Sequence, residues 1–342
     1  MKAMVLRNLG DVRRTASPLS LEIVPDPQPG PGELLIEVDT CGVCHTELDE
    51  IEGRTPPRVL PMILGHQVVG RVIGRGDGAT GIEPGTRVGI AWIHSACGRC
   101  AECLGGDENL CADFRATGRD VPGGYAQRTT VPEAFAHPIP DALSAVAAAP
   151  LLCAGAIGHR SLRLTGIRDG DRLGLTGFGA SAHLVLALAR FRFPRSEVYV
   201  FARHPEERRF ALELGAVWAG DSADVAPHRL RAIIDTTPAW RPVIGALANL
   251  APGGRLVINA IRKEDSDRAE LASLDYPRHL WLEKEIKSVA NVTRSDVREF
   301  LALAADTGIL PEVREVPLED ANTAILDIKR GVGRGARVLR VS

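Results

Sequence analysis

Four of the seven cysteines crowd into fifteen consecutive positions: Cys97, Cys100, Cys103 and Cys111. Four thiolates at this C-x2-C-x2-C-x7-C spacing can close a tetrahedral shell around zinc, and a closed shell stabilises a loop without supporting catalysis. The competing chemistry is an iron–sulfur cluster, whose bacterial run also begins C-x2-C-x2-C but continues with x3-C-P. Here seven residues separate the last two cysteines, and alanine follows. The spacing therefore predicts a structural zinc that pins residues 95–113.

A glycine pattern in the second half of the chain is typical of a dinucleotide site. The apolar run Leu173–Thr176 leads into Gly177, Gly179 and Ala182, which form G-x-G-x-x-A, and a Leu- and Ala-rich stretch follows. The glycines allow a tight turn and the close approach of a pyrophosphate, and the small third residue lets the helix pack on the strand. This pattern, between a strand and a helix, predicts a dinucleotide-binding loop.

Alternating strands and helices must position that loop. From residue 172 onward we expect strands at Arg172–Thr176, Val198–Phe201, Ala232–Asp235 and Arg255–Asn259, and helices at Ala180–Arg190, Pro205–Leu214 and Val243–Leu250. Such alternation is typical of an α/β fold with a doubly wound parallel sheet. Before about residue 140, Gly, Pro and short alternating segments such as Leu34–Val38 and Val68–Ile73 indicate a mostly β domain. The segments after Asn291 are too few for a third domain, so we expect them to complete the first.

The composition is that of an ordinary globular protein. A length of 342 residues exceeds the usual size of one hydrophobic core, so two domains are expected. A net charge of −2 gives no electrostatic reason to expect nucleic acid or a membrane surface as partner. The N-terminus lacks a secretory signal, and the apolar stretch near 145–158 is interrupted by Pro150 and falls short of roughly 20 residues. We therefore expect a cytoplasmic protein without a transmembrane helix, whose crowded cysteines bind metal.

Three segments, in their order along the chain, resemble the zinc-binding medium-chain alcohol dehydrogenases. They are CGVCHTEL at 41–48, GHQ at 65–67 and LCAG at 152–155, with the four-cysteine loop between the second and the third. The resemblance covers essentially the whole chain. It implies a GroES-like catalytic domain formed by residues 1–153 and 293–342, and a Rossmann domain formed by residues 154–292. It also implies a homodimer or homotetramer.

By this resemblance, the ligands of a catalytic zinc are Cys44, His66 and Cys153. Two thiolates and one imidazole leave the fourth position free for water or an alcohol oxygen. Zinc there would act as a Lewis acid that lowers the pKa of the alcohol, so that a hydride can pass to the nicotinamide. Cys41 could offer a C-x2-C pair with Cys44, but the interpretation that we favour for Cys41 is a buried small hydrophobe. One catalytic and one structural zinc per chain are therefore expected.

The surroundings of this site depart from the family pattern. Thr46 matches the hydroxyl that bonds the alcohol and begins a proton relay, but Asp49 stands where the relay histidine is usual. Glu47 replaces a shorter acid that orients the zinc-bound histidine, and Gln67 replaces an acid that follows it. Such changes around the ligands can cost ten- to a hundredfold in affinity or activity. Ile157 also stands where a Thr commonly faces the nicotinamide.

Two residues match positions that line the alcohol pocket in the family, Trp92 and Ile93. They suggest an apolar substrate tail, although both could equally be core residues.

Four further positions bear on the cofactor. His45 and Arg334 match basic residues that face the pyrophosphate in the family. The strand Val198–Phe201 ends in Ala202 and Arg203, without the acid that bonds the adenosine ribose in NAD-specific members. Arg203 can present its guanidinium to a 2′-phosphate, so NADP(H) is expected to be favoured over NAD(H). The alternative is that Arg203 stacks on the adenine or points to solvent.

The expected function is a zinc-dependent interconversion of a small-molecule alcohol with an aldehyde or ketone, with NAD(P) as hydride carrier. A quinone or enone reductase of the same fold is a first alternative, against which the complete ligand set speaks. A non-catalytic sensor that binds zinc and dinucleotide is a second, motivated by the altered surroundings of the ligands.

Overall fold

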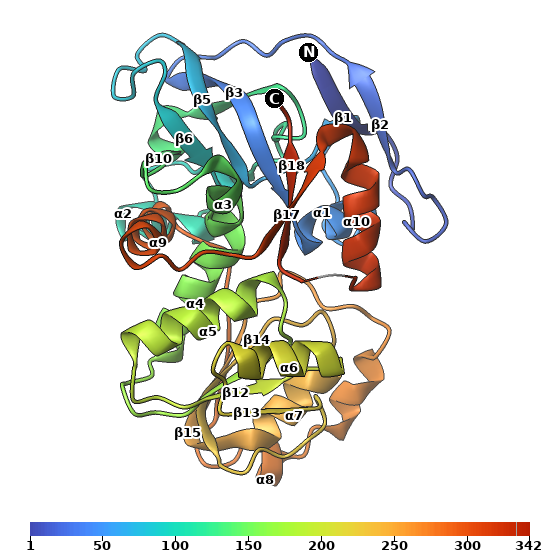
Figure 1. Cartoon of the computed structure of the whole chain (residues 1–342), viewed down its shortest axis with the longest axis vertical. Helices are drawn as coiled ribbons and strands as arrows, with labels where there is room; N and C mark the ends of the chain where they lie inside the picture. The colour runs from blue at the N-terminus through green and yellow to red at the C-terminus, as the bar shows by residue number, and fades with distance from the viewer. Residues whose placement is uncertain (333) are drawn as a thin grey trace. The chain divides into compact units, whose positions relative to one another are not determined.

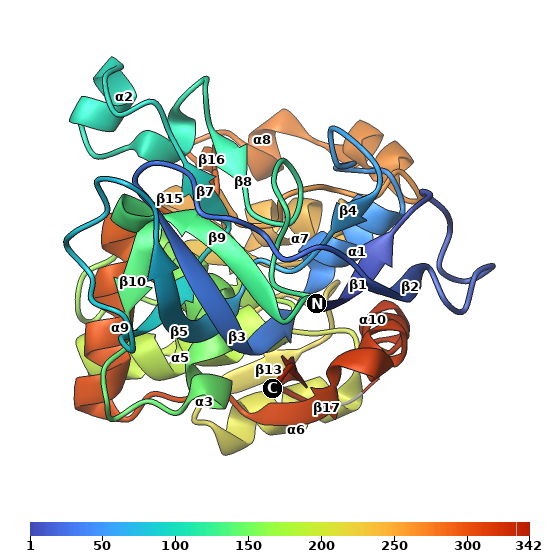
Figure 2. The ribbon, with the colours of Figure 1, turned by 90° about the horizontal axis from the view of Figure 1, so that it is seen from above.

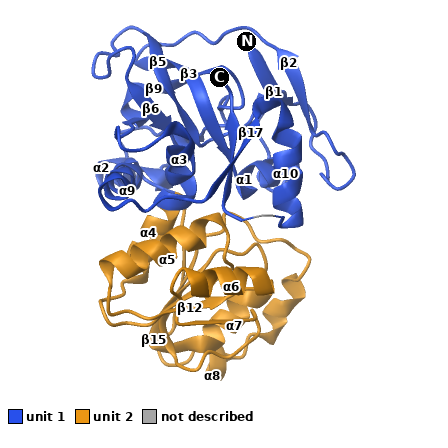
Figure 3. Cartoon of the chain, in the orientation of Figure 1, with its two compact units in different colours: residues 1–156, 292–342 blue, residues 157–291 orange. Residues whose placement is uncertain are grey.

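The computed structural model describes residues 1–332 and 334–342. The chain divides into two compact units, Met1–Ala156 with Val292–Ser342, and Ile157–Asn291 (Figure 3). Sequence reasoning placed the boundaries after residue 153 and before residue 293. The first unit is therefore built from both ends of the chain, and the second from its middle.

The first unit is mostly β. Its main sheet has the order β10-β6-β5-β3-β18-β17, with β9 also paired to β3. The bounds are β3 Glu33–Val43, β5 Val68–Arg75, β6 Arg87–Ile90, β9 Arg128–Pro132, β10 Ala136–Pro138, β17 Val313–Pro317 and β18 Ala336–Arg340. β18 pairs antiparallel with β3, so the C-terminal strand of the chain lies beside its third strand, as Figure 1 shows. The C-terminal strands β17 and β18 are thus part of the sheet of the first unit.

Further elements surround this sheet. β3, β5 and β9 lie side by side in Figure 2, and β1 pairs with β2 and β4 in a separate small sheet. The bounds are β1 Lys2–Leu6, β2 Leu19–Ile23, β4 Met62–Ile63, β7 Ile93–Ser95, β8 Arg115–Ala116, α1 His45–Ile51, α9 Arg294–Thr307 and α10 Ala321–Arg330.

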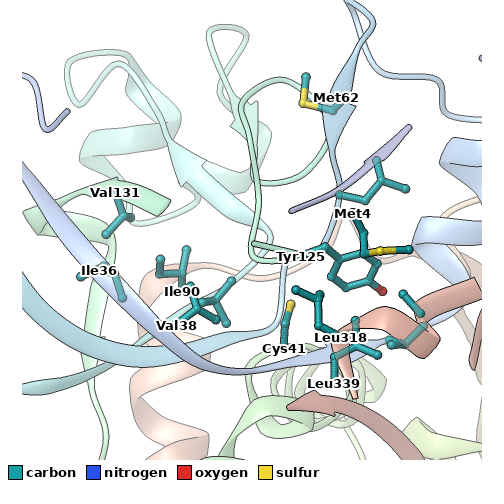
Figure 4. Close-up of a cluster of buried hydrophobic side chains, with 14 of the residues drawn as sticks. Met4, Ile36, Val38, Cys41, Met62, Ile90, Tyr125, Val131, Leu318 and Leu339 are labelled. Carbon is teal, nitrogen blue, oxygen red and sulfur yellow. The ribbon is translucent and has the colours of Figure 1, made fainter. Parts of the chain in front are cut away.

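Alternating apolar residues of the strands form the core of the first unit. Ile36 and Val38 of β3 are fully buried in one cluster with Val131 of β9 and Ile90 of β6 (Figure 4). Burying one such side chain contributes about 1.5–3 kcal/mol. Cys41 is also fully buried in this cluster, as expected for a small hydrophobe. The core thus fixes β3, and the position of the residues that follow β3.

The second unit is a doubly wound parallel sheet in the order β13-β12-β11-β14-β15-β16. The bounds are β11 Leu173–Thr176, β12 Val198–Phe201, β13 Trp218–Gly220, β14 Leu230–Asp235, β15 Leu250–Ile258 and β16 Glu285–Ser288, with helices α5 Ala180–Arg192, α6 Pro205–Glu213 and α7 Arg241–Asn249. The order corresponds to 3-2-1-4-5-6, the arrangement of dinucleotide-binding folds. The predicted fold class is confirmed. Sequence reasoning missed the edge strands β13 and β16, because β13 is short and all four residues of β16 are exposed.

The apolar stretch that contains Pro150 belongs to a longer helical segment than its sequence indicated. Pro150 does not end the apolar stretch: α3 (Ala145–Pro150), the π-helical segment η3 (Leu151–Gly155) and α4 (Ala156–Thr165) follow without a break. A π-helical segment shifts the backbone hydrogen bonds and can accommodate a proline. By length and composition this 21-residue stretch could cross a membrane, but 72% of its apolar window is buried inside the protein. Its apolar surface is therefore covered as in the core helix of a folded domain.

Candidate active site

Cys44 lies where strand β3 ends and helix α1 begins. It is the N-cap of α1: its Sγ accepts a hydrogen bond from the Thr46 N–H at 3.3 Å, and its own N–H donates to Glu47 Oε2 at 2.8 Å. This reciprocal capping box fixes the start of the helix. The Cys44 side chain consequently lies at the N-terminus of helix α1, in a fixed position.

His66 precedes strand β5 and is fully buried. Gly65 before it has φ +96°, and a Cβ there would lie 2.4 Å from the ring of Tyr125, so only glycine allows this approach. His66 Nε2 is 3.7 Å from Cys44 Sγ, and Nδ1 is 2.5 Å from Glu47 Oε1. Burial opposes the charged imidazole, but the Glu47 carboxylate and Cys44 raise the pKa of His66 well above its ordinary value. Glu47 therefore orients the ring and makes Nε2 more basic.

Cys153 comes from the π-helical segment η3, in the middle of the continuous helical stretch. Its Sγ, Cys44 Sγ and His66 Nε2 all lie within 4.8 Å of one another. The structure thus brings together the three residues that the resemblance implied as ligands, from the start of α1, the residues before β5, and η3.

The geometry and charge of this trio fit zinc. Zn–S bonds of about 2.3 Å and Zn–N bonds of about 2.0 Å place tetrahedral ligand atoms about 3.5–3.8 Å apart, close to the 3.7 Å between Cys44 Sγ and His66 Nε2. The hydrogen bond with Cys153 and burial raise the pKa of Cys44 well above its usual range. A cation beside Cys44 would offset this shift and favour its thiolate, and three protein donors would leave a fourth position around that ion open.

The four-cysteine loop forms a second set of ligand atoms within 4.8 Å of one another. Cys97 Sγ lies 3.9 Å from Cys103 Sγ, close to the tetrahedral S–S distance of about 3.8 Å. Cys97 accepts hydrogen bonds from the backbone of Arg99 and Cys100, which lower its pKa to about 6. All seven cysteines are described and none forms a disulfide. The donor set fits a closed zinc shell.

The loop is tied to helix α9 by an ion pair that the sequence did not indicate. Glu108 is buried, and its Oε1 accepts hydrogen bonds from both the backbone N–H and Nε of Arg294, each at 2.9 Å. The Arg294 guanidinium also lies over the ring of Phe135. These contacts anchor the structural loop to the segment that returns from the second unit.

Asp49 has a cationic partner that sequence reasoning missed. Its Oδ1 accepts a hydrogen bond from Arg54 Nε at 2.5 Å, and Arg54 also pairs with Glu52, whose Oε2 binds Lys329 at 2.8 Å. This chain of charges joins α1 to α10. The carboxylate expected to stand in for a relay histidine is thus held in an ion pair.

A fully buried carboxyl, Glu50, lies one helical turn after Glu47. Both of its oxygens lack a hydrogen-bond partner among the described residues. Burial, then the charge of Glu47, raise the pKa of Glu50 well above its usual value. The only sequence signal was the run of acids at 47, 49, 50 and 52 on a short helix.

The second changed position near the metal ligands, Gln67, is buried beside β3. Its carbonyl accepts from the Gly42 N–H at 2.9 Å, and a Cβ on Gly42 would lie 2.6 Å from Gln67 Oε1. Gln67 therefore packs tightly against the segment that leads to Cys44, without adding charge there.

Trp92 and Ile93 are both buried in the first unit. Ile93 is fully buried in the core, whereas Trp92 packs on Phe114 at a ring distance of 4.8 Å and beneath the Arg119 guanidinium. Ile93 is thus a core residue, and Trp92 belongs to an aromatic cluster.

The dinucleotide fingerprint lies between β11 and α5, as its pattern predicts. Gly177 has φ +77°, and a Cβ there would lie 2.8 Å from Thr236 Oγ1. At Gly179, the N-cap of α5, a Cβ would meet nothing within 4 Å, which leaves room for a ligand. Ala182 is fully buried. The helix N-terminus and glycine loop match a pyrophosphate cradle.

The end of β12 carries basic side chains. Arg203 is exposed, and its guanidinium lies 3.2–3.3 Å from His204 Nε2. Arg208 of α6 donates to the Ala202 carbonyl at 3.0 Å and pairs with Asp221. The Arg203 guanidinium is therefore accessible at the place where an adenosine ribose is bound in this fold.

The two other basic residues implied by resemblance belong to the first unit. His45 is the first residue of α1 and is half-buried. Arg334 is exposed and follows α10, and the preceding residue, Gly333, lies outside the described residues. Ile157 is the first residue of the second unit.

Comparisons with known proteins agree with this geometry. Residues 30–141 match the family described as Alcohol dehydrogenase GroES-like domain. A probable alcohol dehydrogenase, AdhA, of Mycobacterium tuberculosis is 44% identical over 320 residues, 92% of this chain and 90% of that protein. Among solved structures, AibC has a TM-score of 0.87 at 28% identity, with 100% of this chain and 96% of that chain covered. A putative zinc-binding dehydrogenase from Sinorhizobium meliloti, bound to NADP, has a TM-score of 0.84 at 26% identity, with 99% and 98% covered. The chain therefore belongs to the zinc-dependent medium-chain alcohol dehydrogenase family.

Proposed function

We propose that the protein interconverts a small-molecule alcohol with an aldehyde or ketone, using zinc and a nicotinamide dinucleotide. The observation that carries the proposal is the convergence of two thiols and one imidazole within 4.8 Å, because three ligands are the donor set of a catalytic rather than a structural zinc. The glycine fingerprint supplies the second requirement, a site for the hydride carrier.

Cys44, His66 and Cys153 would hold the catalytic ion, and the four-cysteine loop a structural one, so we propose two zinc ions per chain. The bound zinc would supply Lewis-acid chemistry to the alcohol or carbonyl oxygen. Glu47 holds the ring of His66 through Nδ1 and thereby directs Nε2 toward Cys44. Thr46, buried one position into α1, offers its hydroxyl as the first acceptor of the alcohol proton, and Asp49 or water would carry the proton onward.

Turnover with a panel of primary and secondary alcohols, with both cofactors and on protein of known zinc content, tests this function. Zinc-loaded protein that binds dinucleotide but oxidises no alcohol and reduces no carbonyl would point instead to a sensor. Reduction of quinones or enones alone would point to a reductase of the same fold.

NADP(H) is the proposed preferred cofactor. The relative from Sinorhizobium meliloti is bound to NADP, and here Arg203 is accessible while Ala202 offers no carboxylate to repel a 2′-phosphate. A charge-assisted contact contributes about 1.5–3 kcal/mol, so kcat/KM should favour NADP(H) by about ten- to a hundredfold. Arg203→Ala should remove most of this preference, and the exposed Arg192→Ala should leave it unchanged.

Steady-state kinetics with both cofactors decide the matter. Ala202→Asp should shift the preference toward NAD(H); its melting temperature must be compared, because Ala202 is fully buried. A wild-type preference for NAD(H), together with no effect of Ala202→Asp, would show that this strand end does not receive the ribose.

Glu47 gives a prediction about the metal. Glu47→Gln removes the carboxylate 2.5 Å from His66 Nδ1 and should lower zinc affinity or turnover about ten- to a hundredfold. Glu47→Asp keeps the charge and should lose less. Competition with a zinc chelator and kcat measurements compare the two variants, and equal behaviour of wild type and Glu47→Gln contradicts the orienting role.

We further propose a cytoplasmic homodimer or homotetramer. The edge strand β16 supports self-association, because all its residues are exposed and exposed apolar side chains lie close to it in sequence, at Trp281 and Leu282. An unpaired, exposed strand edge is a surface on which another strand can pair.

A further inference from the structure

A buried ion pair lies at the carboxyl ends of the central strands of the second unit. Asp235, the last residue of β14, is fully buried, and the side chain of Lys263, in the loop after β15, is 8% exposed. Lys263 Nζ donates to Asp235 Oδ2 and to the carbonyl oxygens of Thr237 at 2.7 Å and Ala239 at 3.1 Å. Three acceptors use all three hydrogens of the ammonium group, so Lys263 is bound to the protein and not free for a ligand phosphate.

The other oxygen of Asp235 reaches the fingerprint. Asp235 Oδ1 accepts hydrogen bonds from Thr176 Oγ1 at 2.5 Å and Thr237 Oγ1 at 2.8 Å. Thr176 is the last residue of β11 and immediately precedes Gly177, over which Thr236 and Thr237 pack closely. One carboxylate therefore joins the ends of β11 and β14 to the loop after β15.

Backbone and capping contacts join the same two loops. The Asn259 N–H donates to the Asp235 carbonyl at 2.9 Å, and the Glu264 N–H to the Pro238 carbonyl at 2.7 Å. Asp267 Oδ2 accepts from the N–H groups of Trp240 and Arg241 at the start of α7, at 2.8 and 2.9 Å. These hydrogen bonds thus join the loops 235–241 and 259–267 to each other. Among these contacts, the Lys263 ammonium is the only buried cation.

The position of these two loops in the sheet indicates which ligand they adjoin. β11 and β14 are neighbours in the order β13-β12-β11-β14-β15-β16, where the strand order reverses. Ligands of open α/β sheets bind outside the carboxyl ends of the strands at this switch point. The adenosine half belongs to the side of β12, so the loops after β14 and β15 adjoin the other half of the dinucleotide.

We propose that the Lys263–Asp235 pair is a positioning device that holds the loops 235–241 and 259–267 in the shape that receives the nicotinamide half of the cofactor. This inference rests on the proposed dinucleotide-dependent function. Removing the ammonium group leaves a buried, unpaired carboxylate and releases the carbonyl oxygens of Thr237 and Ala239. The loops then lose their fixed shape, whereas the β12 side of the sheet keeps its contacts.

The test compares binding of NADPH with binding of 2′,5′-ADP, which lacks the nicotinamide half, by titration calorimetry on the whole zinc-loaded protein. In Lys263→Met, the Kd for NADPH should rise about tenfold or more, while the Kd for 2′,5′-ADP stays within about twofold of wild type. The matched control Lys287→Met removes an exposed lysine of β16 and should change neither constant. The split between the two ligands is not expected from a general loss of stability.

Equal weakening of both ligands in Lys263→Met, or no weakening of NADPH binding, would overturn the inference. Should Lys263→Met fail to fold, the double variant Lys263→Met with Asp235→Asn is used, because it removes the unpaired charge and keeps the hydrogen bonds to Thr176 and Thr237. The double variant should also bind NADPH more weakly and 2′,5′-ADP as wild type does. Unchanged NADPH binding refutes the proposal. Wild-type protein that binds neither NADPH nor NADH would instead refute the proposed function.

Discussion

Cys44→Ser should lower the zinc content from two ions to about one per chain and reduce kcat on the order of a thousandfold or more. The Lewis-acid contribution of a catalytic metal amounts to several kcal/mol, and about 4 kcal/mol corresponds to a factor of about a thousand in rate. The remaining ion would stay in the four-cysteine loop, whose ligand atoms form a separate group.

Serine is a suitable replacement because of what Cys44 does for the fold. Its side chain caps helix α1 by accepting from the Thr46 N–H, and serine is among the preferred N-cap residues. The variant should therefore keep α1 and lose the thiolate. Melting temperature and circular dichroism close to those of wild type would separate a lost metal ligand from a lost fold.

Cys41→Ala is the matched control. Cys41 is three residues earlier and fully buried in the core of the first unit, so the alanine variant should lose some stability but keep both zinc ions. If Cys41→Ala loses zinc while Cys44→Ser keeps two ions and full turnover, the ligand assignment at this segment is wrong.

The features that could be predicted from the sequence depend on residues that lie close together along the chain. The glycine fingerprint depends on residues within one turn, and the four-cysteine loop lies within fifteen positions, so both are visible without tertiary information. The three ligands Cys44, His66 and Cys153 come from distant segments, and only the resemblance joined them. Spacing alone could not have placed their side chains within reach of one ion.

The sequence did not indicate three ion pairs that the structure contains. Asp49 with Arg54, Glu108 with Arg294, and Asp235 with Lys263 are ion pairs of charged residues that lie at or near the ends of helices and strands. A charged residue is usually exposed, and a buried ion pair becomes visible only when the chain has folded. The length of the helical stretch through Pro150 was missed for a related reason, because a π-helical segment has no sequence signature that we could recognise.

Thr46→Val should lower kcat about a hundredfold while NADPH binding and both zinc ions are retained. Proton transfer by a positioned group typically contributes 10²–10⁴-fold, and water can replace part of it, so a loss near the lower end is expected. Valine has nearly the shape of threonine, and Thr46 is only 8% exposed, so packing should survive.

The comparison with Asp49→Asn locates the path that the proton takes after Thr46. Asp49 is paired with Arg54, and asparagine can still accept the Arg54 hydrogen bond, so the fold should be kept. If water carries the proton onward, Asp49→Asn should lose only a few-fold in kcat, whereas a loss as large as that of Thr46→Val would make Asp49 the next acceptor. Measuring kcat in H2O and D2O for all three proteins shows whether proton transfer limits turnover. Full activity of Thr46→Val would exclude its hydroxyl from the relay, because an interaction made only while the alcohol proton moves must appear in kcat when it is removed.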